Sequence, residues 1–373
     1  MLVRRKVAAI LLCIALCLPL LGGCTPKNKY NRYTDTFFHA FDTMIQIVAY
    51  TESEEEFERY FAYASQRFFE LHRLYDIYNN YEGINNLKTI NDNAGKEPVK
   101  VDQEIIDLLL FAKEWHQTAK QANIAMGAVL KIWHDYRTEG KDFPENAKLP
   151  PMELLKKAAA HTDISQVVID DEQNTVYLAD PEMSLDVGAV AKGYATEVVA
   201  RELQAKGLAS GVISAGGNIR TIGRPLDGKR KRWNIGIQDP GSSIVSDQGV
   251  LDVVYVENAS VVSSGDYQRF YVVDGKKYHH IIDPETLLPG TYYHAVTVVT
   301  EDSGVADFLS TALFLMPFEE ALALAENLPG VEALWVMPDG TIKTTPGMKT
   351  ILKARARPIL NGTGRNTRKE GCG

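Results

Sequence analysis

The chain has 373 residues, a net charge of −8 at pH 7 and a hydrophobic fraction of 45%. This length is enough for one large globular domain or two domains of ordinary size. An acidic protein is a poor candidate for binding nucleic acid, which requires a basic surface. Any anionic ligand would therefore need a local binding device such as a metal ion, a helix N-terminus or a glycine loop.

The N-terminus has the pattern of a secretory signal. Basic residues at positions 4–6 precede an apolar run over 7–21, and the sequence Leu-Gly-Gly-Cys ends at Cys24. The run is too short for a permanent transmembrane helix, and small residues precede the expected cleavage point. The Leu-Gly-Gly-Cys ending resembles a bacterial lipobox, in which Cys24 becomes the lipidated N-terminus of an extracytoplasmic protein anchored to the cell membrane. An ordinary signal peptide or a membrane anchor is the alternative.

The distribution of cysteines argues against a disulfide framework. Cys13, Cys17 and Cys24 lie in or at the end of the signal, and Cys372 lies next to the C-terminus. The sequence therefore predicts neither a disulfide framework nor a thiolate metal site. Removal of residues 1–23, which hold three basic and no acidic residues, would change the net charge to −11.

The rest of the chain is expected to form one folded domain. Residues 24–35 are expected to be a polar tether, residues 36–350 the domain, and residues 351–373, which are basic and lack periodicity, a disordered tail. Strands and helices alternate irregularly along the domain, without the regular strand–helix–strand order of a doubly wound parallel sheet. We therefore predict an α+β fold with mixed or antiparallel sheets and flanking helices.

Hydrophobic periodicity places the elements in chain order. Residues 36–50 are expected to form a strand or a strand pair. Segments with helical spacing follow at 54–75, at 102–121 with Asp102 as N-cap, at 125–136 and at 152–161. From residue 166 onward short strands dominate, and they are expected at 167–170, 175–178, 211–215, 233–237, 250–256, 260–263, 295–300, 333–337 and 341–344. Helices are expected between them at 194–206, 302–316 and 318–327.

The segment 263–284 is the stretch around which the domain is expected to be organised. Two runs rich in β-branched and aromatic residues flank Asp274-Gly275, the pair typical of a two-residue type I′ hairpin turn. This turn places Arg269 opposite His280. Because side chains alternate faces along a strand, His279 and His280 point in opposite directions, and only one of them can serve a given site.

His280 is the candidate general base of this segment. Histidine titrates closest to neutral pH, which suits it to accepting a proton during a reaction. A lone histidine on a strand also fits a structural role, but the pairing with Arg269 and the nearby Asp283 favour a site. His279 is assigned to packing or to the surface.

Asp307 and Thr311 form a candidate metal site on the helix expected at 302–316. They are four residues apart, so their oxygens lie on one helical face. Carboxylate and hydroxyl oxygens suit Mg²⁺, which usually also takes substrate phosphates. The alternative is that Asp307 only favours the helix N-terminus and that Thr311 bonds back to its own helix.

Two glycine-containing segments are candidate anion sites. Residues 186–193 open a helix and include Lys192, and glycines there would allow the backbone to approach a phosphate. The second segment is Gly216-Gly217-Asn218 at the end of a strand. Neither matches a known phosphate-binding pattern, so each is also compatible with an ordinary turn.

Taken together, four segments resemble the ApbE family of FAD:protein FMN transferases. They recur in the family's order, and the likeness extends from about residue 41 to about residue 346. The segments are Leu185-Asp-Val-Gly-Ala-Val-Ala-Lys-Gly-Tyr194, Ser214-Ala-Gly-Gly-Asn-Ile219, Ser264-Gly-Asp-Tyr-Gln-Arg269 with His280-Ile-Ile-Asp-Pro284, and Ala306-Asp-Phe-Leu-Ser-Thr-Ala312. The family includes secreted lipoproteins, in agreement with Cys24.

The resemblance implies an α+β fold that holds FAD and Mg²⁺ in a cleft. The metal would be held by the carbonyl of Ala189, Asp307 and Thr311, and the catalytic residues would be His280, which assists deprotonation of the acceptor, and Asp307. The residues expected to bind FAD are Met44, Tyr78, Asp186, Lys192, Gly216, Gly217, Asn218, Ser264, Gly265, Asp266, Arg269 and His280.

The implied reaction transfers FMN from FAD to a Thr or Ser hydroxyl of a partner flavoprotein, with AMP leaving. The acceptor would be an electron-transfer subunit or secreted flavoprotein with a Ser/Thr-Gly-Ala-Thr-like site. The chain departs from the family at 122–127, where Ala-Asn-Ile-Ala-Met-Gly replaces a Phe-Asp-x-Thr-x-Gly pattern. Two other functions stay open at this point: a pyrophosphatase that gives FMN and AMP, and a lipoprotein that binds flavin without chemistry.

Overall fold

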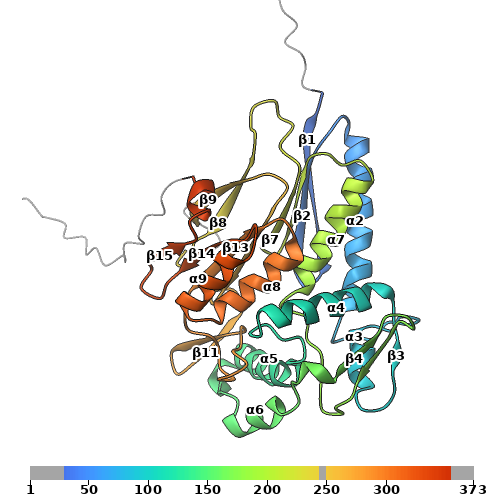
Figure 1. Cartoon of the computed structure of the whole chain (residues 1–373), viewed down its shortest axis with the longest axis vertical. Helices are drawn as coiled ribbons and strands as arrows, with labels where there is room; N and C mark the ends of the chain where they lie inside the picture. Colours follow the sequence, from blue (N-terminus) through green and yellow to red (C-terminus); the bar gives the residue numbers. More distant parts are fainter. Residues whose placement is uncertain (1–28, 243–248, 354–373) are drawn as a thin grey trace, which may run out of the picture.

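The computed structural model describes residues 29–242 and 249–353, and within them an eight-stranded sheet forms the centre of the molecule (Figure 1). Its strands are, in spatial order, β1 (Asn31–Ala40), β2 (Thr43–Thr51), β6 (Gly211–Ala215), β7 (Asn218–Ile222), β10 (Ser260–Gly265), β13 (Ala295–Thr300), β14 (Glu332–Val336) and β15 (Ile342–Thr344). Every neighbouring pair is antiparallel, as predicted.

Helices cover one face of this sheet and a hairpin covers the other. The helices are α2 (Glu54–Tyr75), α7 (Ala191–Ala205), α8 (Ser303–Phe314) and α9 (Phe318–Asn327) (Figure 1). The opposite face packs against β8 (Trp233–Gln238), β9 (Val250–Val256) and the short helix α10 (Met348–Ile351). The sheet is therefore buried on both faces. In β10, Val262 lies in the core on the helix side and its neighbour Val261 lies in the core on the hairpin side.

The chain between α2 and α7 forms a smaller lobe beside the sheet (Figure 1). It contains α3 (Leu87–Asp92), α4 (Gln103–Thr118), α5 (Gly127–Asp142), α6 (Met152–Ala159), the 3₁₀ turns Pro144–Asn146 and Ile164–Gln166, and the strands β3 (Val99–Lys100), β4 (Val167–Asp170) and β5 (Thr175–Leu178). The hairpin of β11 (Phe270–Val273) and β12 (Lys276–His279) packs against α5. Trp133 of α5 and Tyr271 of β11 lie in this third core.

The hairpin has the predicted turn and register. Asp274 and Gly275 have φ values of 49° and 77°, as a type I′ turn requires. Phe270 lies opposite His279, so the two histidines that follow each other take different environments. His279 is buried: its Nδ1 accepts a hydrogen bond from the Ile281 amide at 3.2 Å, and its Nε2 therefore donates to the Gly290 carbonyl at 2.7 Å.

Local sequence signals also set the helix ends. Asp102 caps α4, and the Asp302 side chain caps α8 by accepting a hydrogen bond from the Val305 amide at 3.0 Å. Gly207, with φ of 104°, follows the end of α7. The bounds of α2 and α9 coincide with the predicted ones.

The ends of the domain differ from the prediction. Strand β1 begins at Asn31, inside the expected tether, because residues 31–35 pair with β2. At the other end Leu352 bridges Val254, and the Lys353 amide donates to the Val253 carbonyl at 2.7 Å. The expected signal, Cys24 and the rest of the expected tail lie outside the described residues. No helix in the described part of the chain is long and apolar enough to cross a membrane.

Candidate active site

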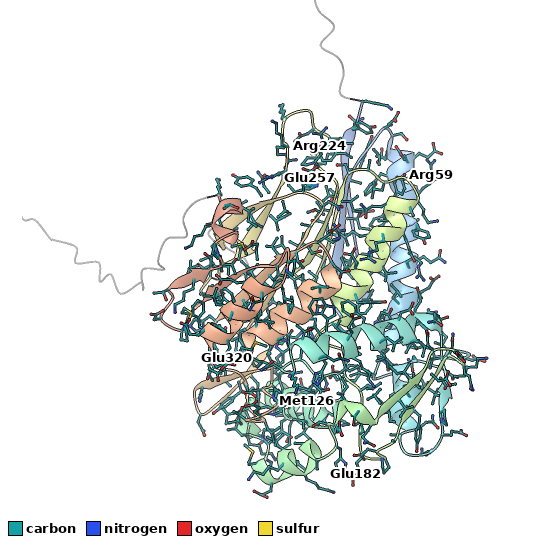
Figure 2. The ribbon with its side chains drawn as sticks, viewed as in Figure 1. Arg59, Met126, Glu182, Arg224, Glu257 and Glu320 are labelled. Carbon is teal, nitrogen blue, oxygen red and sulfur yellow. The ribbon has the colours of Figure 1, made fainter. Side chains whose placement is uncertain are left out.

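A cavity of about 710 Å³ lies between the main sheet, α5, the β11–β12 hairpin, the start of α7 and the face of α8 that carries Asp307 and Thr311. Met126, labelled in Figure 2, lies in its wall, just before α5. Most of the predicted site residues also line the cavity: Met44, Tyr78, Asp186, Ala189, Lys192, Gly216, Gly217, Asn218, Ser264, Gly265, Arg269, His280, Asp307 and Thr311. The fold therefore brings the four predicted segments to one place.

Asp307 is held by the start of the neighbouring helix α7. Its Oδ2 accepts a hydrogen bond from the Gly193 amide at 2.8 Å and lies 3.9 Å from Nζ of Lys192. The side chain is 5% exposed, and burial raises the pKa of the carboxyl group, against the effect of Lys192 and the Gly193 amide. Because Asp302 caps α8, Asp307 is not needed as a cap for its own helix.

Thr311 faces β10. Its Oγ1 lies 3.3 Å from Oγ of Ser264, which in turn lies 2.8 Å from Oγ of Ser310. Within the described residues, the Thr311 hydroxyl makes no hydrogen bond to the backbone of its own helix. The alternative prediction, that Thr311 only bonds back to this helix, is therefore wrong. Asn218 lines the same part of the cavity, and its side chain acts as a hydrogen-bond donor that lowers the pKa of the Asp307 carboxyl group, against the larger effect of burial.

His280 faces the cavity from the end of the hairpin, on the side opposite to His279. Its Nδ1 is buried and has no hydrogen-bond partner among the residues that the structure describes. Burial, and then the charges of Arg269 and Arg137, lower the pKa of the imidazole to about 3. The imidazole is therefore neutral at pH 7 and can accept a proton.

The glycines of the two segments, 186–193 and 216–218, are required for different structural reasons. At Gly193 a Cβ would lie 2.2 Å from the Ser303 carbonyl oxygen, so α7 can approach α8 only without a side chain there. Gly216 has φ of 56° and abuts Thr43, whereas a Cβ at Gly217 would meet nothing within 4 Å. The turn at 216–217 therefore presents bare backbone to the cavity.

Asp186 lies at the start of the glycine segment and faces the cavity. Its Oδ1 accepts a hydrogen bond from the Gly188 amide at 2.8 Å. Burial raises the pKa of its carboxyl group, and the charges of His134, Arg137 and Arg269 act in the opposite direction. Within the described residues, Asp186 thus shares the cavity with Arg137 and Arg269 without forming an ion pair with either.

Asp266 is the one described residue of the predicted set that does not line the cavity. Its Oδ2 lies 2.7 Å from Nδ1 of His294, and its amide donates to the His294 carbonyl at 3.1 Å. The carboxylate raises the pKa of His294. Asp266 directly follows β10, and its contacts with His294 join the end of β10 to the start of β13, so its carboxylate is held away from the cavity.

Several lining residues come from α5 and the loop before it, and none of them is among the predicted site residues. Met126, Leu130, Trp133, His134 and Arg137 line the cavity and recur at a helical spacing. In the segment 122–127, the side-chain Nδ2 of Asn123 donates to the Thr162 carbonyl at 2.9 Å. This helical spacing can be read from the sequence, but it does not identify a site, because every helix with one buried face has the same spacing.

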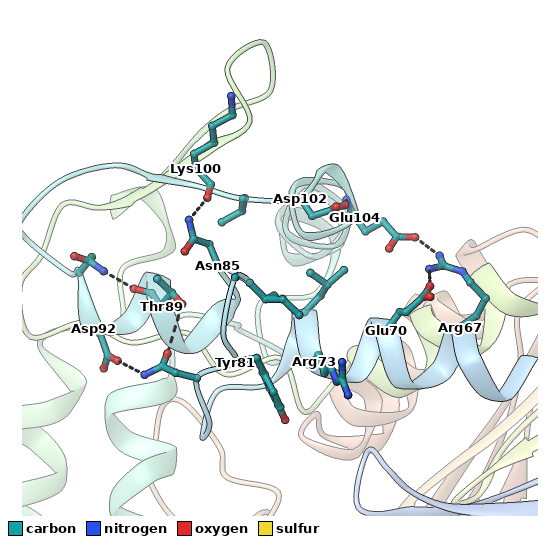
Figure 3. Close-up of a pocket in the computed structure, with 16 residues that line it drawn as sticks. Arg67, Glu70, Arg73, Tyr81, Asn85, Thr89, Asp92, Lys100, Asp102 and Glu104 are labelled. Atoms are coloured by element: carbon teal, nitrogen blue, oxygen red, sulfur yellow. Dashed lines mark hydrogen bonds and ion pairs between the residues drawn. The ribbon is translucent and has the colours of Figure 1, made fainter.

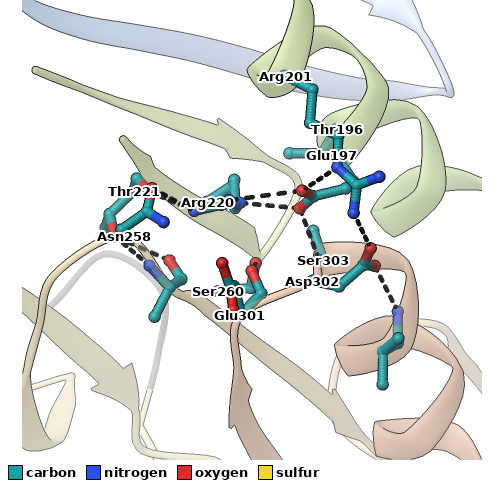
Figure 4. Close-up of polar contacts among 12 residues, drawn as sticks. Thr196, Glu197, Arg201, Arg220, Thr221, Asn258, Ser260, Glu301, Asp302 and Ser303 are labelled. Carbon is teal, nitrogen blue, oxygen red and sulfur yellow. Dashed lines mark hydrogen bonds and ion pairs between the residues drawn. The ribbon is translucent and has the colours of Figure 1, made fainter. Parts of the chain in front are cut away.

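An ion-pair network centred on the buried pair Glu197–Arg220 joins the elements that carry the site (Figure 4). Glu197 of α7 accepts hydrogen bonds from Arg220 of β7 and Arg201 of α7, both at 2.8 Å, and from the Ser303 amide at 2.9 Å. Arg201 also pairs with Asp302, the cap of α8, at 2.7 Å. The network therefore sets the relative positions of α7, α8 and β7, which carry the site residues Lys192, Asp307 and Asn218.

A larger cavity, of about 940 Å³, lies between α2, α3 and the start of α4 (Figure 3). None of the predicted site residues line it. Arg67, one of the cations that line it, pairs with Glu70, Glu104 and Glu202. We assign the active site to the smaller cavity, because only there do unpaired cations, a neutral histidine and a buried carboxylate converge.

The sequence matches the ApbE family over residues 41–335. The chain belongs to the ApbE family. It is 37% identical over 275 residues to an FAD:protein FMN transferase of Treponema pallidum, across 70% of this chain and 73% of the relative. It is 30% identical over 277 residues to an FAD:protein FMN transferase of Klebsiella pneumoniae, across 74% of this chain and 82% of the relative.

Solved ApbE structures have the same fold as this chain. The ApbE protein of Thermotoga maritima superposes with a TM-score of 0.74 at 28% identity, across 86% of this chain and 99% of that protein. The flavin transferase ApbE of Vibrio cholerae gives a TM-score of 0.71 at 24% identity, across 86% of this chain and 99% of that protein. The predicted ApbE family and α+β fold are therefore confirmed.

Proposed function

We propose that this protein is an FAD:protein FMN transferase. It transfers the FMN moiety of FAD to a Thr or Ser hydroxyl of a partner flavoprotein, with release of AMP. Membership of the ApbE family and the names of its relatives support the reaction class. The observation that carries the proposal is the convergence of His280, Asp307 and Lys192 in one cavity large enough for a dinucleotide.

Mg²⁺ would be held by Asp307, Thr311 and the carbonyl of Ala189. These donors are hard oxygens in a partly buried site, as Mg²⁺ prefers, and they leave positions for water and for substrate phosphate. No group of three or more His, Cys, Asp and Glu residues that could hold a metal occurs in the described part of the chain. A site with one carboxylate fits a metal that arrives with a pyrophosphate. When bound, the metal neutralises pyrophosphate charge.

The residues of the chain would carry the transfer as follows. His280 accepts the proton of the acceptor hydroxyl, whose oxygen forms a bond to the flavin-side phosphorus of FAD. The bond from this phosphorus to the bridging oxygen breaks, and AMP leaves with the electron pair. Lys192, which lines the same cavity, would offset negative charge on the leaving phosphate. The support for this assignment is the place of His280 in the cavity wall, where its Nδ1 has no hydrogen-bond partner among the described residues.

Flavin or adenine rings would contact the exposed apolar side chains at the cavity edge. Met44 and Tyr78 are 52% and 54% exposed and both line the cavity. The Tyr78 ring lies 5.3 Å from the His134 ring, which holds it against α5. Aromatic and thioether side chains of this kind favour stacking on a planar ligand.

The N-terminal sequence supports a location for the reaction, and the proposed reaction supports a class of acceptor. Cys24 would carry the lipid that anchors the protein to the outer face of the cell membrane. The acceptor would be an extracytoplasmic flavoprotein with a Ser/Thr-Gly-Ala-Thr-like site, such as a membrane electron-transfer subunit. Metabolic labelling with a fatty acid, compared between the wild type and Cys24→Ala, tests the anchor.

The reaction is tested with the full chain in detergent, FAD, Mg²⁺ and an acceptor domain that carries such a site. The products are followed by mass spectrometry. We expect an acceptor heavier by one FMN moiety and an equal amount of AMP. Free FMN and AMP with an unmodified acceptor would instead establish a pyrophosphatase, and FAD that stays bound and uncleaved with two different acceptors would establish a carrier.

A further inference from the structure

Helix α5 adds a cation to the cavity that none of the predicted segments contains. Arg137 lies on the same face of α5 as Leu130, Trp133 and His134, and all four line the cavity. Trp133 fixes this face, because its Nε1 donates to the Leu287 carbonyl at 2.9 Å and its ring is buried. The position of Arg137 is therefore set by a packed helix.

Arg137 has no anionic partner in the described part of the chain. Its one hydrogen bond there joins Nη2 to Nδ1 of His134 at 3.2 Å, and Arg137 belongs to none of the ion pairs between described residues. Because a guanidinium has five N–H donors, most of them stay available to a ligand. Asp186 lines the same cavity but pairs with neither Arg137 nor Arg269.

Arg269 lies close to Arg137 and is also unpaired within the described residues. The charge of Arg269 contributes, after burial, to a lowered pKa of Arg137, and both arginines contribute to the lowered pKa of His280. Two guanidinium groups that repel each other in a partly buried cavity cost stability unless an anion joins them. Phosphate oxygens are the anions that paired guanidinium groups bind best.

We propose that Arg137 and Arg269 together bind the flavin-side phosphate of the substrate, and that His134 is a positioning residue that orients Arg137. This inference rests on the proposed function. The flavin-side phosphate is the one attacked by the acceptor, so it must lie next to the base His280. Both arginines line the cavity together with His280, and after burial their charges lower the pKa of its imidazole. At this place they would face the negative charge that grows as the new bond forms.

The test is binding of FMN, riboflavin and AMP to the full chain in detergent, without acceptor, measured by calorimetry. Riboflavin and AMP each lack the flavin-side phosphate. We expect Arg137→Gln to weaken FMN binding about tenfold or more and to leave riboflavin and AMP within about twofold. His134→Ala should weaken FMN binding less than Arg137→Gln does. Arg137→Lys should retain part of the FMN affinity, because lysine keeps the positive charge but lacks the paired N–H donors of the guanidinium group.

Lys131→Gln is the matched control, since it removes the same charge from the same helix at a site where the side chain is 72% exposed and paired with Asp135. It should leave all three affinities unchanged. Equal loss of FMN and riboflavin binding in Arg137→Gln would overturn the proposal, and so would loss confined to AMP or no loss at all. A wild type that binds FMN no better than riboflavin would also overturn it. Since these measurements need no transfer, failure of the transferase assay is a separate result.

Discussion

The amide of Gly193 and the carboxylate of Asp307 join two helices at the centre of the site. They are 114 residues apart in sequence, yet the amide nitrogen lies 2.8 Å from Oδ2, and a Cβ at position 193 would lie 2.4 Å from Cβ of Asp307. The start of α7 and the middle of α8 therefore touch without an intervening side chain. This contact holds Lys192 beside the candidate metal ligand.

Gly193→Ala should push α7 away from α8. The added methyl group would lie 2.2 Å from the Ser303 carbonyl oxygen, which is backbone and cannot swing aside. We expect a loss of about 1–3 kcal/mol in the free energy of unfolding, together with loss of transferase activity. Chemical denaturation and the acceptor assay measure both. Gly236→Ala is the control, because its Cβ would make ordinary contacts at 3.5 Å; equal effects of the two variants would contradict the prediction.

Asp307→Ala should abolish Mg²⁺-dependent turnover. The variant removes the only carboxylate of the proposed metal site, and we expect a fall of about 100-fold or more in kcat/KM that added Mg²⁺ does not restore. Glu320→Ala, an exposed acidic residue of α9 labelled in Figure 2, removes the same charge outside the site. Full activity of Asp307→Ala would show that the carboxylate only supports the helix contact.

His280→Ala should separate binding from chemistry. If the imidazole accepts the proton of the acceptor hydroxyl, the variant keeps the affinity for FAD within a few fold and loses about 10²–10⁴-fold in transfer rate. Fluorescence titration of FAD and the mass of the acceptor measure the two effects. Loss of FAD binding would make His280 a ligand contact instead.

The imidazole of His280 should stay neutral in the free protein below the usual titration range of histidine. Its pKa of about 3 lies below the value of the unfolded chain, about 6.5. Only the unfolded chain then binds this proton between those pH values, so His280 lowers the free energy of unfolding as the pH falls through the window.

NMR titration of the His280 Cε1–H resonance, assigned with His280→Ala, checks this pKa. Arg269→Gln should raise it, because a like charge is removed. A midpoint near pH 6.5 in the wild type would contradict the prediction.

Glu197→Gln should destabilise the whole domain. The Arg220 side chain is 3% exposed, and loss of its carboxylate partner leaves a buried charge unpaired. We expect a decrease of about 3 kcal/mol in the free energy of unfolding. Asp135→Asn, which breaks the exposed pair with Lys131, should change it by less than about 0.5 kcal/mol. Denaturation of both variants decides whether the network of Figure 4 supports the fold.

Features with a short-range cause were predictable from the sequence. The type I′ turn at Asp274-Gly275 depends on two residues that tolerate positive φ, and it set the register that separates His279 from His280. The helix ends at Asp102 and Asp302 depend on side chains that cap the next few amides. The spacing of Asp307 and Thr311 on one helical face is of the same kind.

Features that depend on packing between distant segments required the tertiary structure. Asp266 belongs to a predicted motif, but the pairing of β10 with β13 turns it toward His294. Arg137 lies outside every predicted motif, and only the docking of α5 against the β11–β12 hairpin brings it into the cavity. A sequence pattern sets which face of an element is apolar, whereas the partner of a polar side chain is chosen by how whole elements pack.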